Sequence, residues 1–445
     1  MLVNEKIYEL IENKKYLEIK ITLAEMHPGD ISDIIEELPA HFGGILFRLL
    51  PKDMAVSVFE NLDSPAREML LHSLKSEEIA NILNEMSPDD RTRLFEELPA
   101  HIVKKYLAML DDKERKIAYQ LLGYKDNTAG RLMTPDFVDL HEQDTVDTAL
   151  ATIRHTAPNK ETIYYSYVMT EHRKLTGVIS LRKIITSPGE AKIGDLMSTS
   201  VIAVSTDTHQ EEVASIMAQY DLLAIPVVDL ENRLVGIITH DDILDVIQEE
   251  DTKDIHLMGG VSTHEKSLLE LSIWDNIKRR AGWLIILILV ESFSSNIIKS
   301  YEDALSAVVA LSFFIPMLID TGGNAGTQSA TVVIRAIATG EIEKKDSWKV
   351  LGKELISGLI LGVLLGFLGG FKAFLSHTDP LIGITVGCSL LVVVALASIT
   401  GALLPMIAVK LNLDPAVMAG PFITTVVDIV GLMTYFEIAK SIMNI

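Results

Sequence analysis

The sequence predicts a multi-domain membrane protein, with a water-soluble front and an all-α membrane-spanning back. The chain has 445 residues, of which 48% are hydrophobic, and yet its formal net charge is -22. After Ala281 there are 9 Lys and Arg and 12 Asp and Glu, whereas the residues up to that point carry 30 basic and 49 acidic side chains. An acidic front therefore precedes an apolar back. Such acidity disfavours nucleic acid as a partner and permits cations.

Residues 1–128 predict an α-solenoid, because short helical segments recur along them. Residues 26–41 (MHPGDISDIIEELPAH) resemble residues 86–101 (MSPDDRTRLFEELPAH), and the segments between them are degenerate copies. Repeated short helices that bury their faces by stacking form solenoids. Asp89 and Asp90 lie at the start of one copy, where the positive end of the helix dipole is the preferred explanation and metal binding is the alternative.

A second duplication covers residues 129–194 and 195–254. Leu132-Met133-Thr134 matches Leu196-Met197-Ser198, and LTGVIS at 175–180 matches LVGIIT at 234–239. Strand-like runs alternate with helical runs in both halves. This pattern resembles a tandem pair of CBS domains, an α/β regulatory module.

The CBS resemblance implies an adenine nucleotide, such as ATP, as one ligand to test. In such sites a Thr or Ser and an Asp three residues later contact the ribose. Thr239 and Asp242 provide this pair in the second half, whereas Lys183 takes the place of the acid in the first half. Tyr165 and Arg182 add an aromatic ring and a phosphate partner. The nucleotide site is therefore half formed.

Residues 239–254 (THDDILDVIQEEDTKD) concentrate acidic side chains on one predicted helix. A solvated acidic face is the ordinary explanation of such a run. The alternative is a divalent-cation sensor, because Mg²⁺ prefers oxygen ligands and needs only one or two carboxylates per ion. A membrane pore later in the chain favours the sensor.

Residues 255–280 connect this region to the membrane. Within them, 265–280 (EKSLLELSIWDNIKRR) predict an amphipathic helix at the membrane interface, with Trp and basic residues at the headgroups. Residues 281–445 then predict five transmembrane helices. These spans are 281–298, 304–338, 350–375, 384–409 and 415–442. The distribution of Lys and Arg places the N-terminal domains in the cytoplasm and the C-terminus outside. No cleaved signal peptide is expected.

Polar residues inside two spans predict an ion path. Residues 316–330 (PMLIDTGGNAGTQSA) combine glycines with amide and hydroxyl groups, which membrane helices tolerate where they face protein or water. Asp428 lies near the middle of the last span, where a carboxylate costs roughly 2.5–3.5 kcal/mol. The expected pore-lining residues are Gly322, Gly323, Asn324, Thr327, Gln328, Thr424 and Thr425. No nucleophile–base pair, zinc motif or Walker loop indicates an enzyme.

The order of these regions resembles the bacterial MgtE magnesium transporter/channel family. The stretch at 316–330, LDPAVMAGPFITTVVDIVGLMTYF at 413–436 and YDLLAIPVVD at 220–229 carry the resemblance. It implies a homodimeric Mg²⁺ channel of the inner or plasma membrane, with Asp428 in the pore and closure by cytosolic Mg²⁺. The implied sensor acids are Asp89, Asp90, Glu211, Asp221, Asp242, Asp245, Glu250, Asp254 and Asp414. The alternatives are a nucleotide-sensing membrane receptor and a broader Mn²⁺/Co²⁺ transporter.

Overall fold

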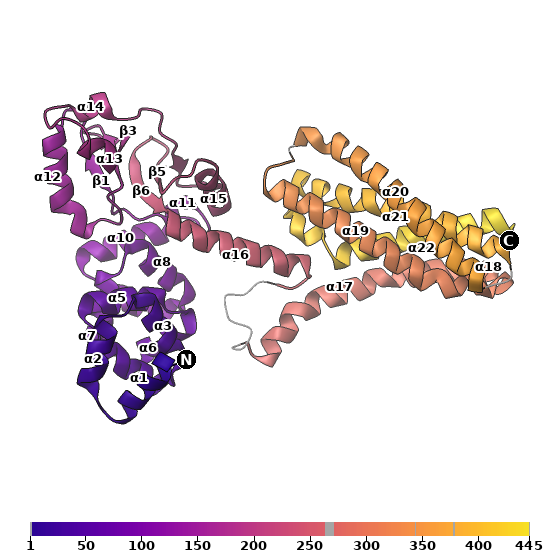
Figure 1. Ribbon diagram of the computed structural model, residues 1–445, viewed down its shortest axis with the longest axis horizontal. Coiled ribbons are helices and arrows are strands. Elements are labelled where there is room, and N and C mark those ends of the chain that lie inside the picture. Colours follow the sequence, from indigo (N-terminus) through magenta and orange to yellow (C-terminus); the bar gives the residue numbers. More distant parts are fainter. Residues whose placement is uncertain (1, 263–270, 343, 377–378, 445) are drawn as a thin grey trace. The chain divides into compact units, whose positions relative to one another are not determined.

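The computed structural model describes residues 2–262, 271–342, 344–376 and 379–444 (Figure 1). The chain divides into two compact units, Met1–Glu249 and Glu250–Ile445, here named the front unit and the back unit. The long helix α16 (His240–Met258) begins in the front unit and ends in the back unit.

The front unit begins with short helices of nearly equal length. From α3 onward each helix starts twelve residues after the previous one, commonly with proline or an acid in its first turn. This regular spacing confirms the predicted repeat and shows that a new helix begins every twelve residues. The helices are α1 (Leu2–Glu12), α2 (Tyr16–Ala24), α3 (Pro28–Glu37), α4 (Ala40–Arg48), α5 (Lys52–Asn61), α6 (Ser64–Ser73), α7 (Ser76–Glu85), α8 (Pro88–Glu97), α9 (Ala100–Leu107) and α10 (Asp112–Leu122).

Recurring hydrogen bonds hold this helical stack in register. A side chain near the end of α3, α5 or α7 accepts a hydrogen bond from a backbone N–H group. The donor is the N-cap residue of the third helix further along the chain, which is α6, α8 or α10. The pairs are Asp63 to Glu36 (2.8 Å), Ser87 to Glu60 (3.1 Å) and Asp111 to Asn84 (2.7 Å). Each bond joins residues 27 apart, and successive bonds lie 24 residues apart. Two helices thus form one repeating unit.

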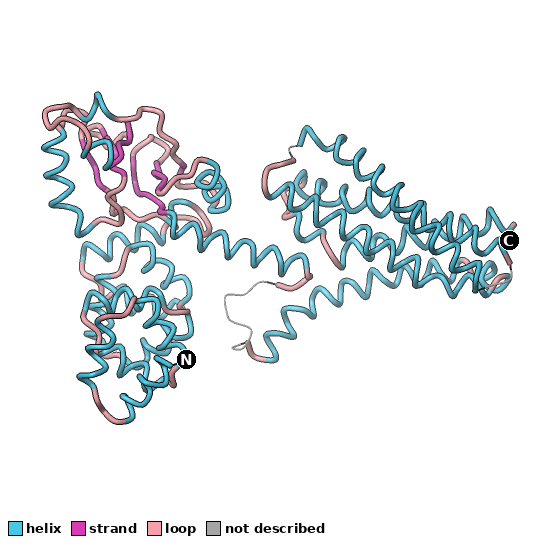
Figure 2. The backbone as a smooth tube through the Cα atoms, in the orientation of Figure 1, coloured by secondary structure: helices cyan, strands magenta, loops and turns pink. Residues whose placement is uncertain are grey.

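The rest of the front unit contains two three-stranded sheets of the same topology (Figure 2). In each sheet the first strand is parallel to the second, which is antiparallel to the third. The strands are β1 (Val138–Leu140), β2 (Tyr165–Met169) and β3 (Leu175–Ser180), then β4 (Val204–Ser205), β5 (Ala224–Val228) and β6 (Leu234–Thr239). The helices besides α16 are α11 (Ala129–Leu132), α12 (Val146–Thr156), η1 (Ala157–Asn159), α13 (Leu181–Ile185), α14 (Ile193–Leu196) and α15 (Gln210–Gln219).

The duplicated glycines and methionines pack the two halves against each other. A Cβ on Gly236 would lie 2.6 Å from the sulfur of Met133, and Gly177 meets Met197 in the same way. A side chain at either glycine would displace the methionine of the other half. Each half therefore packs its glycine against the methionine of the other half. This reciprocal contact explains why the Leu-Met-Thr/Ser and apolar-Gly-apolar motifs occur together in both halves.

The back unit contains the long apolar helices. By length and composition, four described segments can cross a membrane: α17 (Ile273–Ser300), α20 (Ser347–Ser376), α21 (Pro380–Lys410) and Pro415–Met443, which comprises η4 (Pro415–Met418) and α22 (Pro421–Met443). The other elements are α18 (Glu302–Ala307), η2 (Val309–Phe314), α19 (Ile315–Ala338) and η3 (Lys344–Asp346). The 24 residues of α19 extend about 36 Å, enough for a hydrocarbon core of about 30 Å. A fifth span formed by α19 remains a prediction.

Helix α21 forms the centre of this bundle. It packs against α19, α20 and α22, and α17 packs against α22. Buried apolar side chains such as Leu318, Val386, Leu390, Leu432 and Phe436 fill the core between these helices. The carboxylate-bearing helix α22 is thereby supported from several sides.

The predicted boundary between a connecting helix and the first span is wrong as a helix boundary. Residues 263–270 of that predicted helix lie outside the described residues. Its remainder merges into α17, which begins after the Ser272 cap and continues past Ala281 without a break. Lys278, Arg279 and Arg280 are good helix formers, and no proline interrupts them. Helix α16 likewise continues beyond the predicted domain end at residue 254.

Candidate functional site

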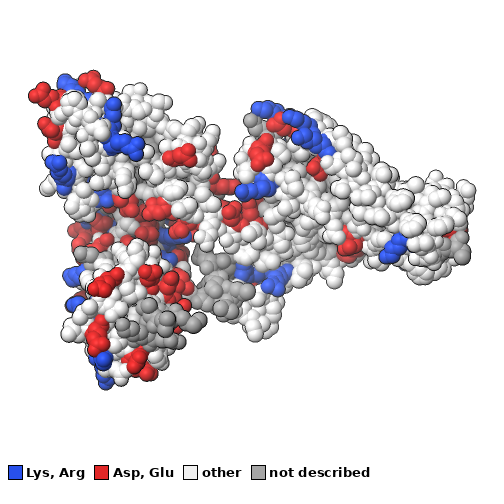
Figure 3. All heavy atoms as spheres, viewed as in Figure 1, with Lys and Arg blue, Asp and Glu red and all other residues white. Residues whose placement is uncertain are grey.

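Six acidic side chains gather in the front unit where the N-terminal helices meet the sheet-containing halves. In Figure 3 a band of Asp and Glu crosses this part of the unit. Glu60 ends α5, two acids lie in the first turn of α8, one acid follows η1, and two acids open α16. This acidic cluster comprises Glu60, Asp89, Asp90, Glu161, Asp241 and Asp242.

Hydrogen bonds position several of these carboxyl groups. Asp90 accepts from the hydroxyl of Ser87 at 2.7 Å, and the backbone N–H of Ser87 donates to Glu60. Asp242 accepts from the Thr239 hydroxyl at 2.5 Å and from the Thr239 N–H at 3.3 Å. Asp89 is buried, and its Oδ1 has no hydrogen-bond partner within the described parts of the chain.

Burial and mutual repulsion raise the pKa values of Glu60, Asp89 and Asp242 in this cluster. Burial, followed by the charge of Asp90, raises the pKa of Glu60 to about 7. Burial also raises the pKa of Asp242 to about 7, although the hydrogen bond from the Thr239 hydroxyl lowers it, and the charge of Asp241 adds a smaller increase. Burial and the charge of Asp242 hold the pKa of Asp89 well above its usual range. Charge on the cluster near neutral pH is therefore unfavourable, and protons or cations relieve it.

The structure gathers some of the predicted sensor acids and separates others. Asp89, Asp90 and Asp242 share the cluster, whereas Asp245 forms an ion pair with Arg93 at 2.8 Å. Arg93 also pairs with Glu249. Arg93 thus supplies the positive charge that the prediction assigned to an ion at Asp245.

The remaining predicted sensor acids lie on other elements. Glu211 is in the first turn of α15, and Asp221 follows that helix with a φ of +51°. Glu250 pairs with Lys253 at 2.7 Å, Asp254 lies near the end of α16, and Asp414 accepts from the Ala416 N–H of η4 at 2.8 Å. Among the described residues, no group of three or more His, Cys, Asp and Glu side chains is arranged to hold a metal ion.

Sequence reasoning missed Glu60 and Glu161, and it placed Asp241 only in the acidic run at 239–254 without naming it as a sensor acid. Glu60 lies in a degenerate repeat copy, but its 24-residue spacing from Glu36 was a usable signal, because both cap a later helix. Glu161 is a single acid in a loop, and its proximity to Asp242 comes only from the tertiary fold.

The nucleotide half-site keeps the arrangement that the sequence indicates. Tyr165 and Ser180 are partners across β2 and β3, and the Ser180 hydroxyl accepts from the N–H of Lys183 at 3.3 Å. Arg182 is exposed on α13. In the second half, Asp242 belongs both to the Thr239 pair and to the acidic cluster, so a ligand at either would involve the same carboxyl group.

In the back unit, Asp428 lies in the second turn of α22. Its Oδ1 is buried and has no hydrogen-bond partner among the residues that the structure describes. Glu291 of α17 and Asp320 of α19 are the acids whose charges reach it. An unpartnered carboxylate oxygen next to other acids, within apolar helices, favours a bound or passing cation.

Helix α19 presents a polar stripe, defined here as Asp320, Asn324 and Gln328. These side chains are exposed and lie one helical turn apart, so they share one face. The Asn324 amide donates to Asp320 at 3.3 Å. Lipid is a poor neighbour for such a face, which calls for water or another protein surface.

The glycines beside this stripe form close contacts between helices. Gly322 and Gly323 are buried, and a Cβ on them would lie 2.8 Å from Val393 and 3.2 Å from Thr424. They are packing positions against α21 and α22, and their place in the lining of an ion path remains a prediction. Glycine permits both uses, and only the helix contacts separate them.

Most of the hydroxyl groups predicted to line the path donate hydrogen bonds to carbonyl groups of their own helix. Thr424 and Thr425 each donate to the carbonyl of Pro421 at 2.9 Å. The Thr327 hydroxyl is buried and lacks a partner in the described ranges.

The end of α16 meets the start of α22 at Gly420. This glycine has a φ of +49° and a ψ of -117°, and the carbonyl oxygen of Met258 occupies the space where a Cβ would stand. Met258 also packs against a cluster that contains Ile423 and Val427. The helix that leaves the acidic cluster thus ends on the helix that carries Asp428.

Comparisons with known proteins cover most of the chain. The MgtE divalent cation transporter model matches residues 315–438, the MgtE intracellular N domain matches 26–127, and the CBS domain matches 129–189 and 193–249. The magnesium transporter MgtE of Thermus thermophilus is 38% identical over 98% of both chains. That of Bacillus subtilis is 33% identical over 99% of this chain and 97% of its own.

Two solved structures resemble the front of the chain. The cytosolic domain of the Mg²⁺ channel MgtE in complex with ATP shares 36% identity with a TM-score of 0.53, covering 55% of this chain and 99% of that one. The soluble part of a magnesium transporter shares 31% identity with a TM-score of 0.53, covering 56% and 97%.

Proposed function

Because the chain belongs to the MgtE family of divalent cation transporters, we propose that it is a Mg²⁺ uptake channel closed by cytosolic Mg²⁺. Its relatives from T. thermophilus and B. subtilis are named magnesium transporters, and each aligns with this chain over nearly its full length. The observation that supports the transport step most directly is the unpartnered carboxylate oxygen of Asp428 within apolar helices.

Asp428 attracts the cation and holds it through its water shell. Mg²⁺ dehydrates reluctantly and usually keeps several waters, so few protein ligands suffice. The polar stripe of α19 supplies amide and carboxylate groups that can bond to those waters. Glu291 and Asp320 increase the negative potential around Asp428.

The proposed path lies between two copies of the chain. The polar stripe is exposed in one copy, and a symmetric partner would cover it without exposing it to lipid. Five spans, with α19 among them, would place the N-terminal domains in the cytoplasm and the C-terminus outside the inner or plasma membrane.

Gating begins at the acidic cluster. At low cytosolic Mg²⁺ its carboxylates repel, and at high Mg²⁺ bound ions stabilise the arrangement that brings them together. Each ion needs only one or two carboxylates and its own waters. Helix α16 begins at this cluster and ends on α22, so it couples the cluster to Asp428.

The test of transport is uptake by a strain that depends on external Mg²⁺. The chain is expected to restore growth and Mg²⁺ uptake in that strain. Competing Mn²⁺ or Co²⁺ should reduce uptake weakly in a Mg²⁺ channel and strongly in a broader divalent transporter. Absence of any divalent uptake by correctly inserted protein would contradict the proposal.

The acidic cluster makes stability depend on pH in a defined direction. The folded-state pKa of about 7 for Glu60 and Asp242 exceeds the values near 4 of the unfolded chain. The folded state therefore binds more protons between about pH 4 and 7, and stability falls as the pH rises through this window. For Glu60 alone the loss is about 3 kcal/mol. The Glu60 contribution alone should make a fragment of residues 1–262 without Mg²⁺ unfold roughly 6–12 °C lower at the upper end, by calorimetry, and Asp242 increases this shift.

Two controls separate this effect from general charge repulsion. Glu60→Gln should reduce the pH dependence by the share that Glu60 contributes, whereas Glu85→Gln, an exposed acid at the end of α7, should leave it unchanged. Saturating Mg²⁺ should also flatten it. Equal slopes with and without Mg²⁺ would show that the cluster does not bind the ion.

Adenine nucleotide is the second candidate ligand. The related cytosolic domain was solved with ATP, and Thr239 with Asp242 forms one half of such a site here. Calorimetric titration of the same fragment with ATP should be weakened by Asp242→Asn and Tyr165→Ala. Unchanged ATP binding in both variants would place the nucleotide elsewhere.

A further inference from the structure

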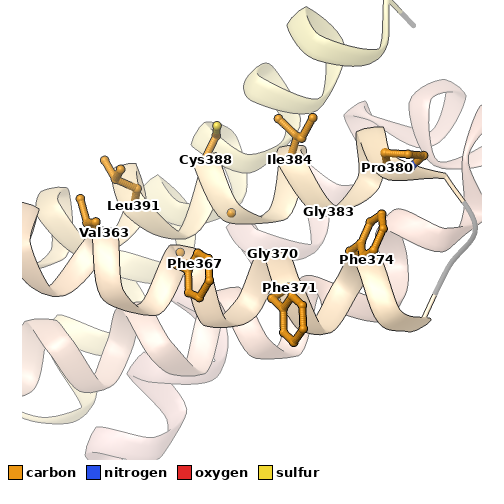
Figure 4. A pocket seen from close by; sticks show the side chains of 12 residues that line it. Val363, Phe367, Gly370, Phe371, Phe374, Pro380, Gly383, Ile384, Cys388 and Leu391 are labelled. Carbon is orange, nitrogen blue, oxygen red and sulfur yellow. The ribbon is translucent and has the colours of Figure 1, made fainter.

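An apolar groove of about 530 Å³ lies between α20 and α21, apart from the proposed ion path. Its lining contains no charged side chain. One wall comes from α20 and the other from α21, as Figure 4 shows. The wall residues used below are Phe367, Phe371 and Phe374 of α20 and Ile384, Cys388 and Leu391 of α21.

The floor of the groove is backbone. A Cβ on Gly366 would lie 2.6 Å from the carbonyl oxygen of Gly387, and a Cβ on Gly370 would lie 2.8 Å from that of Gly383. The two helices therefore touch through their glycines, and no side chain fills the space between the walls. The groove results from this close packing and is present before any ligand arrives.

The α20 wall consists of ordered aromatic rings. The rings of Phe367 and Phe371 are nearly parallel, with an interplanar angle of 7° and centroids 6.2 Å apart. Phe367, Phe371 and Phe374 are all exposed, with Phe367 at 70%. Rings that line an open groove in this way offer a large apolar contact surface to a slender ligand.

The position of the groove indicates a lipid as its occupant. Both walls belong to helices that are long and apolar enough to cross a membrane, so hydrocarbon surrounds them. The polar stripe of α19 requires water or protein, whereas the side chains described in the groove lining carry no charged, amide or hydroxyl group. A second copy therefore suits the stripe, and a lipid suits the groove.

The dimensions of the groove match one leaflet. From Val363 to Phe374 it follows α20 for about 16 Å, close to half of a hydrocarbon core of about 30 Å. One end lies at Phe374 and Pro380, near the point where α20 ends and α21 begins. The groove thus extends from the helix ends toward the middle of the membrane.

We propose that this groove is a binding site for one acyl chain of a phospholipid from the leaflet where α20 ends. The chain lies between the phenylalanine wall and the wall formed by Ile384, Cys388 and Leu391. Bulk lipid is as apolar as the groove, so the gain comes from dispersion contacts on three sides of the chain. Such a chain exchanges more slowly than lipid on the convex helix surfaces and remains through purification.

Native mass spectrometry of the full chain in detergent tests this site. The wild-type protein should retain about one phospholipid per chain. Cys388→Trp should lose it, because the indole fills the groove from the α21 wall. The matched control is Leu403→Trp, which places the same side chain at an exposed position of α21 outside the groove and should retain the lipid.

A second variant and a second readout keep the outcome clear. Ile384→Trp fills the groove from a different turn and should also remove the lipid. Added phospholipid should raise the unfolding temperature of the wild type and of Leu403→Trp more than that of either groove variant. Equal lipid retention by all proteins would overturn the proposal. Dissociation of an oligomer by the groove variants, with lipid content unchanged, would also overturn it and assign the groove to a second copy.

Discussion

Asp428→Asn is expected to reduce Mg²⁺ uptake by roughly a hundredfold or more, which corresponds to about 3 kcal/mol of lost cation stabilisation. The amide keeps the size of the carboxyl group and removes its charge. Because a membrane carboxylate costs roughly 2.5–3.5 kcal/mol, the variant should be at least as stable as the wild type. Uptake into vesicles that contain the purified variants, together with their unfolding temperatures, measures both effects.

The matched control for Asp428→Asn is Asp303→Asn. Asp303 is an exposed acid in the first turn of α18, so the same chemical change there removes a charge outside the proposed path. Asp320→Asn should give an intermediate loss, because Asp320 acts on Asp428 only through its charge. Wild-type uptake by Asp428→Asn would remove this residue from the transport mechanism.

Gly420→Ala is expected to uncouple Mg²⁺ binding in the front unit from closure of the pore. A side chain at a φ of +49° and a ψ of -117°, a sparsely populated conformation, costs about 1–3 kcal/mol, and its Cβ would collide with the carbonyl oxygen of Met258. The end of α16 must then move away from α22. If α16 transmits closure, uptake by Gly420→Ala should continue at cytosolic Mg²⁺ concentrations that close the wild type.

Gly340→Ala is the control variant that introduces backbone strain without the collision. Gly340 also has a positive φ of +71°, but nothing lies within 4 Å of an added Cβ. This variant should carry the strain and keep normal closure by Mg²⁺. Flux measured from vesicles at several internal Mg²⁺ concentrations distinguishes the two variants. Normal closure of Gly420→Ala would show that the Met258 contact does not transmit the signal.

Self-similar segments made much of the fold predictable. The helical repeat and the duplicated sheet units leave recurring motifs, and the matched segments at 175–180 and 234–239 are the strands β3 and β6. The three-residue strand β1 is too short to give a periodic signal. The connector was misjudged because a change in composition at Ala281 marks a change of environment, whereas α17 continues through it.

A site residue could be predicted from the sequence where its position in the chain is costly in free energy. A carboxyl group in an apolar span is costly, and Asp428 was therefore visible in the sequence. Glu60 and Glu161 are ordinary acids in polar segments, and only the packing of α5, α8 and α16 gives them shifted pKa values. The close packing of Gly322 could not be predicted, because glycine is typical both of close helix contacts and of open polar paths.

The 24-residue spacing of the capping bonds gives the front unit a modular length. Deleting residues 52–75 would bring Glu36 to a point 27 residues before Ser87, which is the place that Glu60 now occupies. Insertions or losses of two whole helices can therefore occur in evolution while an acid remains beside Asp90. Changes of any other length would break the register of the caps and remove that acid from the cluster.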